Sequence, residues 1–327
     1  MEPKSALVIV PEGKAGHETQ SVAVAEALGC VPRIVRVRLT PPWSWIAPLG
    51  PGHLEGPLAP PWPPLVIASG RQAIPAARAL ARHKAPRPFV VILHDPRVRP
   101  SAFDLVWVND HDFLRRPALE QASNVIHTPT APLRATRARM TEGAAQLLPR
   151  VSHLPGPRIG VLVGGPSGAY GFSAGEAAEL GRRLAEAATR SGGSLLITPS
   201  RRTPPEAQAA LRAAISGVPG FFWDGSGDNP YFGILGLADH LVVTCDSVAM
   251  LSEAAATGRP VHAFPLAGGT RKFALFHEAL IRAGVMDWFD GTLTERSYSP
   301  IDATEMIAAE IRTRLGDQMP ATSRQSA

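Results

Sequence analysis

The chain has 327 residues, of which 45% are hydrophobic and 19% charged, a balance that excludes an intrinsically disordered protein. No apolar run approaches the ~18–20 residues of a membrane-spanning helix, so we do not expect a membrane-spanning protein. The formal charge of +5 is spread without a dense block of Lys and Arg, so nucleic acid is not expected as a partner.

The first half of the chain alternates short apolar, β-branched runs with helical stretches. The expected strands are residues 6–10, 33–39, 65–68, 89–93, 105–108 and 125–127, and the expected helices are residues 17–28, 72–83 and 133–148. This alternation predicts an open parallel sheet with helices on both faces. Prolines crowd into residues 41–64, which favours an irregular insertion there.

The second half restarts the same pattern after a proline-rich stretch at residues 149–157, where we place the domain linker. The expected strands are residues 158–163, 194–198, 241–244 and 260–264, and the expected helices are residues 173–190, 204–215, 248–257, 272–283 and 302–315. Ser173 and Glu176 form a predicted capping box.

The predicted fold is α/β, with two Rossmann-like parallel-sheet domains that face a cleft. The expected divisions are residues 1–150, residues 151–300, a C-terminal helix at 301–316 that packs back on the N-terminal domain, and a disordered tail at 317–327.

Metal and cofactor signals are missing from the sequence. Cys30 and Cys245 are far apart, and there is no HExxH, GxSxG or GKS/T pattern. We therefore expect no metal and no cofactor. Two isolated thiols favour a reducing compartment such as the cytoplasm.

A glycine-rich turn at residues 11–17 follows the first strand and opens a helix, with Gly16 and His17 at its end. A helix N-terminus offers unpaired N–H groups to a ligand. In one interpretation His17 is a catalytic or substrate-binding group in a cleft. In the other it is a solvent-facing residue of an ordinary turn.

A second glycine-rich turn at residues 164–169 follows the strand at 158–163. Ligands of open α/β sheets bind at such strand ends. The small residues Gly165, Ser167 and Gly168 would leave backbone N–H groups free for a phosphate. The alternative is a flexible loop.

A third constellation covers residues 245–253. Asp246 or Ser247 can cap the following helix, which carries Met250 and then Glu253 about two turns in. A carboxylate in that position could accept hydrogen bonds from the hydroxyls of a ribose. The alternative is a surface glutamate on an alanine-rich helix.

Further polar clusters follow other strands. Ser200, Arg201 and Arg202 follow the strand at 194–198, and arginine forks suit diphosphates. Asn229 begins an Asn-Pro turn before Tyr231. In the first half, residues 69–71 and residues 94–97 also follow strands. Each cluster is either a binding group or an ordinary loop.

Residues 164–169, 238–239 and 252–260 together resemble the nucleotide-sugar domain of GT-B glycosyltransferases, in particular the N-acetylglucosaminyltransferase of the peptidoglycan lipid precursor. The resemblance implies that Gly165, Ser167 and Gly168 contact phosphate and that Glu253 holds the ribose. It also implies that the first domain lies on the acceptor side, where Gly16 and His17 match the family's catalytic Gly-His.

Across nearly its full length the chain resembles the bacterial branch of the mitochondrial fission (elongated-mitochondria) family. The resemblance rests on the strings at residues 13–21, 95–97, 198–204, 229–231 and 246–250. Plant members of that family help recruit a dynamin-related protein to mitochondria. Bacterial members are often labelled as nucleotide-sugar epimerases.

These observations favour a metal-independent, inverting glycosyltransferase that takes a nucleotide-diphosphate sugar and transfers the sugar to an unknown acceptor, with His17 as general base. One alternative is a nucleotide-sugar 2-epimerase that uses His94 and Asp95. The other is a non-enzymatic scaffold of the mitochondrial fission family.

Peripheral contact with the inner membrane is a separate hypothesis. Residues 41–64 contain Trp43, Trp45 and Trp62, which either touch a membrane interface or pack on their own domain.

Overall fold

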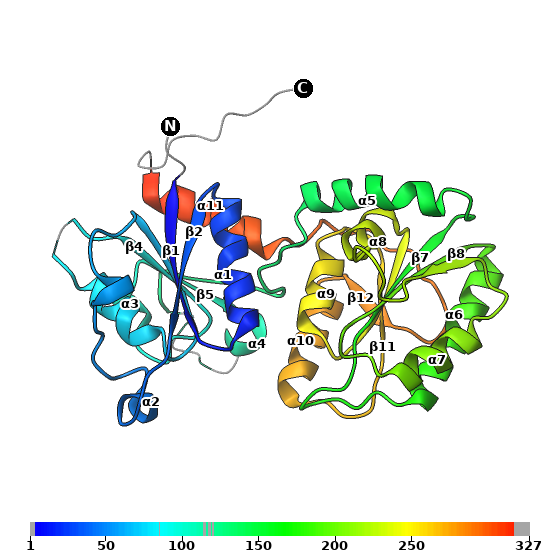
Figure 1. Ribbon diagram of the computed structural model, residues 1–327, viewed down its shortest axis with the longest axis horizontal. Helices are drawn as coiled ribbons and strands as arrows, with labels where there is room; N and C mark the ends of the chain where they lie inside the picture. Colours follow the sequence, from blue (N-terminus) through cyan, green and yellow to red (C-terminus); the bar gives the residue numbers. More distant parts are fainter. Residues whose placement is uncertain (1–3, 85, 114–115, 117–118, 120, 317–327) are drawn as a thin grey trace, which may run out of the picture. The chain divides into compact units, whose positions relative to one another are not determined.

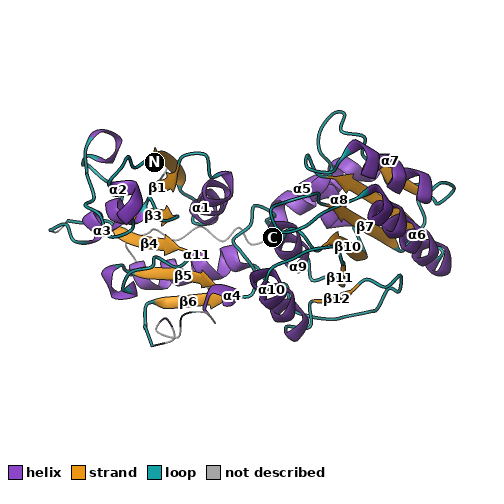
Figure 2. Ribbon diagram, turned by 90° about the horizontal axis from the view of Figure 1, so that it is seen from below, coloured by secondary structure: helices purple, strands orange, loops and turns teal. Residues whose placement is uncertain are grey.

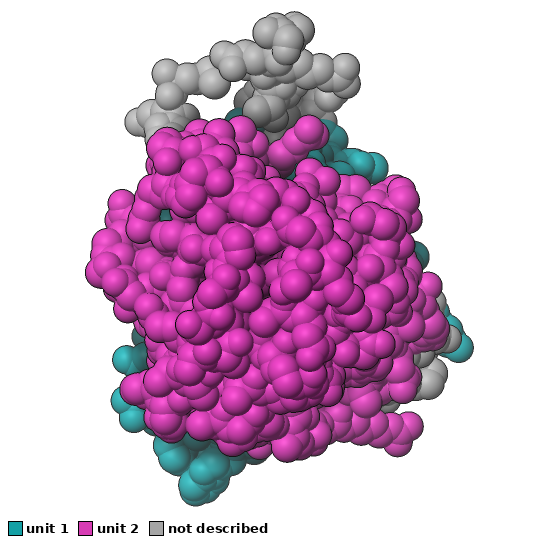
Figure 3. Space-filling view, turned by 90° about the vertical axis from the view of Figure 1, so that its right-hand side faces the viewer, with its two compact units in different colours: residues 1–134, 302–327 teal, residues 135–301 magenta. Residues whose placement is uncertain are grey.

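The structure is a computed structural model that describes the chain except residues 1–3, 85, 114–115, 117–118, 120 and 317–327. The described residues form two compact units (Figure 3), which we call unit 1, from residues 1–134 and 302–327, and unit 2, from residues 135–301. The tail at residues 317–327, for which we expected disorder, lies outside the described residues.

Unit 1 is built on a parallel sheet. Its described strands are β1 (Ser5–Pro11), β2 (Val31–Val37), β3 (Leu65–Ser69), β4 (Phe89–Leu93), β5 (Leu105–Asn109) and β6 (Val125–Thr128), in the order β2-β1-β3-β4-β5-β6. Its described helices are α1 (Ala15–Ala27), α2 (Trp43–Ile46), α3 (Ile74–Ala81), α4 (Asp110–Phe113) and α11 (Ala303–Leu315), with 3₁₀ turns at Gly56–Leu58 and Pro100–Ala102. Figures 1 and 2 show α1 and α11 on one face of the sheet and α3 on the other. Cover on both faces explains why β3 and β5 are buried at every residue.

Unit 2 repeats this plan with a different strand order. Its described strands are β7 (Arg158–Val163), β8 (Ser194–Pro199), β9 (Gly220–Phe222), β10 (His240–Thr244), β11 (Val261–Phe264) and β12 (Met286–Trp288), in the order β12-β11-β10-β7-β8-β9. Its described helices are α5 (Arg137–Val151), α6 (Ala174–Ser191), α7 (Pro205–Ala214), α8 (Tyr231–Leu237), α9 (Val248–Ala255) and α10 (Arg271–Arg282). Figures 1 and 2 show α6 and α7 on one face and α9 and α10 on the other.

The predicted α/β class and the two parallel sheets are confirmed. The predicted capping box of α6 is also present, because Ser173 accepts from the Glu176 N–H while Glu176 accepts from the Ser173 N–H. The sequence prediction missed β9 and β12, which are only three residues long and show no periodicity. It also missed α8, whose two glycines lower its helix propensity.

The unit boundary falls at residues 134 and 135, earlier than the expected division at residue 150. The expected linker at residues 149–157 lies inside unit 2, because α5 continues through Pro149 to the fully buried Val151. Helix α5 packs closely on α8, where a Cβ atom on Gly143 would lie 2.6 Å from the Gly233 nitrogen. The two glycines thus allow the backbones to touch, which joins α5 to unit 2.

The C-terminal helix α11 belongs to unit 1. The Arg312 guanidinium donates to the carbonyl of Ala27 at the end of α1, at 2.6 Å. The buried Thr304 hydroxyl donates to the Leu133 carbonyl at 3.0 Å and accepts from the Leu133 N–H at 2.6 Å. Unit 1 is therefore assembled from two separate stretches of the chain.

Candidate functional site

The strand order of unit 2 reverses at its first strand. The chain proceeds from β7 outward to β8 and β9, then returns to place β10 on the other side of β7. Ligands of open α/β sheets bind outside the carboxyl ends of the strands at such a switch point. The turn at residues 164–169 follows β7 and residues 245–247 follow β10, so both lie at the switch point of unit 2.

Asp246 is the centre of a hydrogen-bond network at this switch point. Its side chain is 0% exposed, and it accepts from the Thr244 hydroxyl at 2.7 Å, from the Gly165 N–H at 3.1 Å and from the Arg202 guanidinium at 2.8 Å. A buried carboxylate requires such partners to compensate for lost hydration. Because Gly165 follows β7 and Arg202 follows β8, Asp246 ties together the segments that follow β7, β8 and β10.

The N–H groups of the glycine-rich turn are mostly bonded already, which differs from the free donors that we expected. The Gly165 N–H is held by Asp246, and the Ser167 N–H donates to the Tyr170 carbonyl at 2.9 Å. The Ser167 hydroxyl oxygen accepts from the N–H groups of Ala169 and Tyr170, both at 3.2 Å. Gly168 is exposed, and its N–H makes no hydrogen bond with another described residue.

Two glycines of the turn are required by close packing. A Cβ atom on Gly164 would lie 2.1 Å from an Asp246 carboxylate oxygen, and one on Gly165 would lie 2.3 Å from the Arg202 carbonyl oxygen. Gly168 differs, because nothing lies within 4 Å of its Cβ position. Gly164 and Gly165 thus allow the close packing of the network, whereas the Cβ position of Gly168 is open.

The loop after β8 contains two arginines, of which one belongs to the Asp246 hydrogen-bond network and the other does not. Arg202 donates to Asp246 and to the carbonyls of Gly165 and Pro166, at 2.8 and 3.1 Å, and its own N–H donates to the Ser200 hydroxyl oxygen at 3.2 Å. Arg201 is exposed and makes no hydrogen bond or ion pair with any other described residue. Arg201 is therefore the cation of this loop that an anion could bind without breaking a contact.

Helix α9 begins at the switch point of unit 2. Ser247 caps it by accepting from the Met250 N–H at 3.3 Å. Met250 is 9% exposed and packs in the core, which makes it a structural residue of α9. About two turns along, the Glu253 carboxylate accepts a hydrogen bond from the Tyr231 hydroxyl. Burial and the Glu253 charge raise the pKa of Tyr231 well above its ordinary value, so Tyr231 remains a donor.

Asn229 positions Tyr231. Its side-chain oxygen accepts from the Tyr231 N–H at 3.0 Å and from the Thr198 hydroxyl at 3.5 Å, which links the end of β8 to the start of α8. Asn229 also lines a cavity of about 470 Å³ between α5 and α8. Asn229 therefore acts on the Glu253 contact through Tyr231.

Unit 1 also has a switch point, between β1 and β3. There His17, near the start of α1, makes a 2.6 Å hydrogen bond through Nδ1 to the hydroxyl of Ser69, which is fully buried at the end of β3. The His17 ring meets the His94 ring edge-on at 5.1 Å, and His94 Nε2 lies 2.7 Å from the Gln20 amide oxygen. Gly16 precedes them with nothing within 4 Å of its Cβ position.

His94 and Asp95 follow β4 in the same unit. His94 has a backbone φ of 79°, a conformation that is strained for a residue other than glycine and is typical of functional sites. The Asp95 carboxylate accepts from the Arg97 N–H at 2.8 Å and from the Arg116 guanidinium. Asp95 is thus already held by a cation from the segment that follows α4.

The structure brings together three of the predicted residues, Gly165, Arg202 and Asp246, with Ser200 beside Arg202. It pairs Glu253 with Tyr231 and His17 with Ser69. Sequence reasoning missed Thr244 and Gln20. Thr244 carried a signal, because it is the polar last residue of an apolar strand.

The described residues contain no group of three or more His, Cys, Asp or Glu side chains that could hold a metal ion. The two switch points contain hydrogen-bond donors, arginines, carboxylates and imidazoles.

Comparison with known structures supports the GT-B type of fold. The UDP-GlcNAc 2-epimerase of Neisseria meningitidis, solved bound to UDP-GlcNAc, is 12% identical with a TM-score of 0.53, covering 94% of this chain and 90% of that one. Os79 of O. sativa, solved in complex with UDP, is 15% identical with a TM-score of 0.51, covering 95% and 91%. At these identities the likeness shows the fold alone, and the predicted GT-B class is confirmed.

Comparison of the sequence with known proteins identifies relatives of this chain. The mitochondrial fission protein ELM1 of Arabidopsis thaliana is 31% identical over 274 residues, which cover 77% of this chain but only 64% of that protein. A sequence profile described as "Mitochondrial fission ELM1" matches residues 15–315. The predicted family resemblance is thereby confirmed, and the chain belongs to the mitochondrial fission ELM1 family.

Proposed function

We propose that unit 2 binds a nucleotide-diphosphate sugar at the switch point between β7 and β10, and that the protein is a metal-independent glycosyltransferase. The observation that carries this proposal is the Asp246 network, which fixes three loops at the place where open α/β sheets bind their ligands. Those loops carry the exposed Ser167, Gly168 and Arg201. Because the Gly165 N–H already donates to Asp246, we assign Gly165 the role of connecting the loops and not that of a hydrogen-bond donor to phosphate.

The diphosphate needs positive charge, because its negative charge grows as it leaves the sugar. Arg201 can supply a guanidinium fork, and Arg202 sits beside it with a side chain that is 43% exposed. The N-terminus of α9, at Ser247, adds a partial positive charge at the same edge of the sheet. Together these groups would stabilise the leaving diphosphate without a metal.

Glu253 is assigned to the ribose. Its carboxylate is oriented by the Tyr231 hydroxyl, and a carboxylate with a fixed orientation discriminates well between hydroxyl donors. His17 is assigned the role of general base on the acceptor hydroxyl. Its Nδ1 contact with the Ser69 hydroxyl fixes the orientation of the ring, and we assign the proton transfer to Nε2.

A nucleotide-sugar 2-epimerase is the second candidate. The strained φ of 79° at His94 favours it, because strain of this kind concentrates where a side chain must be held for chemistry. Asp95 next to it would be the partner acid or base. One of the structures similar in fold is a 2-epimerase.

The direct test is a titration of the purified protein with UDP, GDP, ADP, TDP and CMP sugars while its melting temperature is measured. A ligand at about 100 times its Kd should stabilise the folded protein by about 2.7 kcal/mol. Glu253→Gln should weaken the productive nucleotide about tenfold or more, because the charged acceptor is lost while the Tyr231 hydroxyl keeps an acceptor. The control is Glu278→Gln on α10, an exposed glutamate for which no change in affinity is expected.

The outcomes separate the candidate functions. Isotope exchange on the nucleotide sugar in the absence of an acceptor would favour the epimerase, whereas turnover only with an acceptor would favour the transferase. A protein that responds to none of the nucleotides would contradict both enzymes. The non-enzymatic scaffold would then remain, as the mitochondrial fission relative suggests.

A further inference from the structure

The proline-rich segment at residues 41–64 exposes its apolar side chains at one place. Trp45 is 73% exposed, Leu49 69%, Ile46 47% and Trp43 38%, and these four residues define what we call the α2 tip. Trp62 of the same segment behaves differently. Its indole N–H donates to the Leu58 carbonyl at 2.8 Å, and its ring packs edge-on against His83. Two of the three tryptophans of the segment are therefore presented to solvent.

The backbone below the α2 tip is held by two arginines. Arg71 donates to the Ser44 carbonyl at 3.0 Å, and Arg78 on α3 donates to the carbonyls of Pro48 and Leu49 at 3.1 and 3.3 Å. Ala47 between them is buried. The exposed side chains thus stand on a fixed support, so their exposure is a property of the fold.

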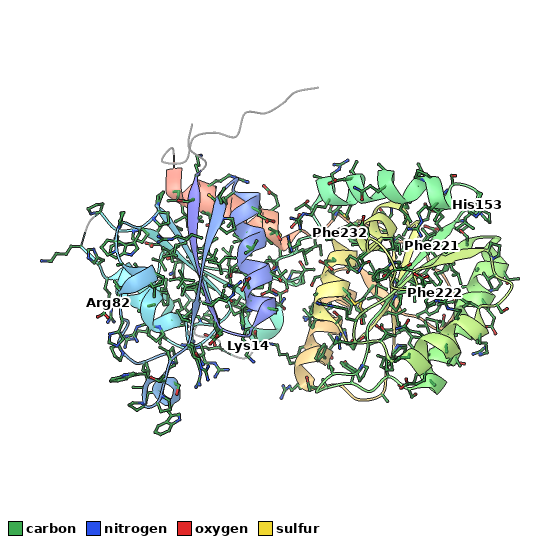
Figure 4. The ribbon with its side chains drawn as sticks, viewed as in Figure 1. Lys14, Arg82, His153, Phe221, Phe222 and Phe232 are labelled. Carbon is green, nitrogen blue, oxygen red and sulfur yellow. The ribbon has the colours of Figure 1, made fainter. Side chains whose placement is uncertain are left out.

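The charged residues around the α2 tip comprise three cations and two acids. Residues 39–54 contain no Asp, Glu, Lys or Arg. The three neighbouring strands β2, β1 and β3 are each followed by a cation at their carboxyl ends, namely Arg38, Lys14 and Arg71. Figures 1 and 4 show α2 and Lys14 at this same end of unit 1. The nearby acids are Glu55 and Glu12, the latter 3.8 Å from Arg38.

We propose that the α2 tip inserts into the interfacial region of an anionic lipid bilayer, with Arg38, Lys14 and Arg71 facing the lipid phosphates. Tryptophan combines an apolar ring with an N–H donor and is enriched at that depth of a membrane. Two exposed tryptophans beside Ile46 and Leu49, with cations behind them, combine apolar insertion with electrostatic attraction.

A lipid surface fits this tip better than a protein partner does. Figure 1 shows α2 projecting from the end of unit 1. Four side chains on a projection cannot supply the ~800 Å² per partner of a stable protein interface, whereas a bilayer deforms around them. None of the helices in the described part of the chain is long and apolar enough to cross a membrane, so the contact that we propose is peripheral.

The test is co-sedimentation of the full chain with vesicles of phosphatidylglycerol and phosphatidylcholine in equal parts, and with vesicles of phosphatidylcholine alone. No nucleotide is added, so the result does not depend on the proposed enzymatic function. We expect the wild-type protein to bind the anionic vesicles and to lose affinity as salt is added. Trp45→Ser/Leu49→Ser should weaken binding about tenfold or more. Arg38→Gln should weaken it up to about fivefold.

The matched control is Leu148→Ser/Met306→Ser, which removes two exposed apolar side chains of other helices, 41% and 50% exposed. It should bind vesicles like the wild type. All variants should keep the wild-type melting temperature, because the changed side chains lie on the surface. Brominated lipid should quench the wild-type tryptophan fluorescence, and Trp45→Phe should remove much of that quenching.

Three results would overturn the proposal. The first is a wild-type protein that does not bind anionic vesicles. The second is a Trp45→Ser/Leu49→Ser variant that binds as well as the wild type, because attraction would then be purely electrostatic. The third is a change of oligomeric state in the absence of vesicles when the α2 tip is mutated, because the tip would then contact a second copy of the chain.

Discussion

At the switch point of unit 2 a buried carboxylate joins three loops, whereas at the switch point of unit 1 a half-buried histidine meets a buried serine. Asp246, Arg202 and Gly165 form a charged network, and His17 and Ser69 form a single hydrogen bond of 2.6 Å. Both contacts lie where the loops after two adjacent parallel strands meet. The same architecture thus carries a charged network at one switch point and a histidine–serine contact at the other.

The largest effect should follow from removing the carboxylate of unit 2. Asp246→Ala should destabilise the protein by about 3 kcal/mol, because the Gly165 N–H, the Thr244 hydroxyl and Arg202 all lose their acceptor. Urea unfolding measures this loss. Arg202→Ala should cost about 1–2 kcal/mol, because its side chain is partly exposed and Asp246 keeps two other donors. A loss below about 0.5 kcal/mol for Asp246→Ala would show that the network does not hold the loops.

Two glycines of the same turn provide a matched pair. Gly165→Ala should destabilise by about 2 kcal/mol, because its Cβ would lie 2.3 Å from the backbone carbonyl of Arg202. Gly168→Ala should leave the free energy of unfolding unchanged, because its Cβ position is open. Denaturant titration of both variants measures the difference. Equal losses of unfolding free energy in the two variants would contradict the inference that Gly165 is tightly packed and Gly168 is open.

The pH dependence of the unfolding free energy provides a further comparison between the units. His262 of unit 2 is 1% exposed, and burial, followed by the nearby His240, lowers its pKa from 6.5 to about 4. The unfolded chain therefore binds this proton more readily, so the stabilisation is present above the unfolded pKa and is lost as pH falls from about 7 toward 4. Between pH 7 and about pH 5 the loss from His262 should be about 2 kcal/mol.

The measurement is urea unfolding at both pH values. His262→Phe should flatten the pH dependence by the amount that His262 contributes. An unchanged slope in that variant would place the acid sensitivity elsewhere, for example on the buried His277, whose pKa burial also lowers.

The smallest effect is expected in unit 1. Ser69→Ala should cost about 1 kcal/mol, because it removes one hydrogen bond to His17 that is partly replaced by water. Urea unfolding of the variant and the wild type measures this loss. A loss below about 0.5 kcal/mol would mean that Ser69 only packs beside the ring.

The sequence was informative wherever local pattern decides the structure. The apolar runs at residues 6–10 and 65–68 predict β1 and β3, and small and polar residues directly after a strand mark the loops at the carboxyl edge. The choice of hydrogen-bond partner was not predictable in the same way. The Gly165 N–H is taken by a carboxylate 81 residues later in the chain, and no local pattern reports a contact at that separation.

Two other differences between the sequence-based predictions and the structure also have local causes. Residues 149–157 look like a linker because of their prolines, yet α5 continues through Pro149 because Val151 is buried beyond it. The three tryptophans at 43, 45 and 62 are alike in sequence. The structure distinguishes them, because Trp62 packs and donates a hydrogen bond to Leu58, whereas Trp45 is exposed to solvent.

The return of α11 to unit 1 sets an order for folding during synthesis. Unit 2 comes from one continuous stretch, so it can close as soon as residue 301 has left the ribosome. Unit 1 starts first but must wait for Ala303–Leu315, which cover part of α1. The part of α1 that Ala303–Leu315 cover therefore stays exposed throughout the translation of unit 2, and it is at this stage that a chaperone would have most to bind.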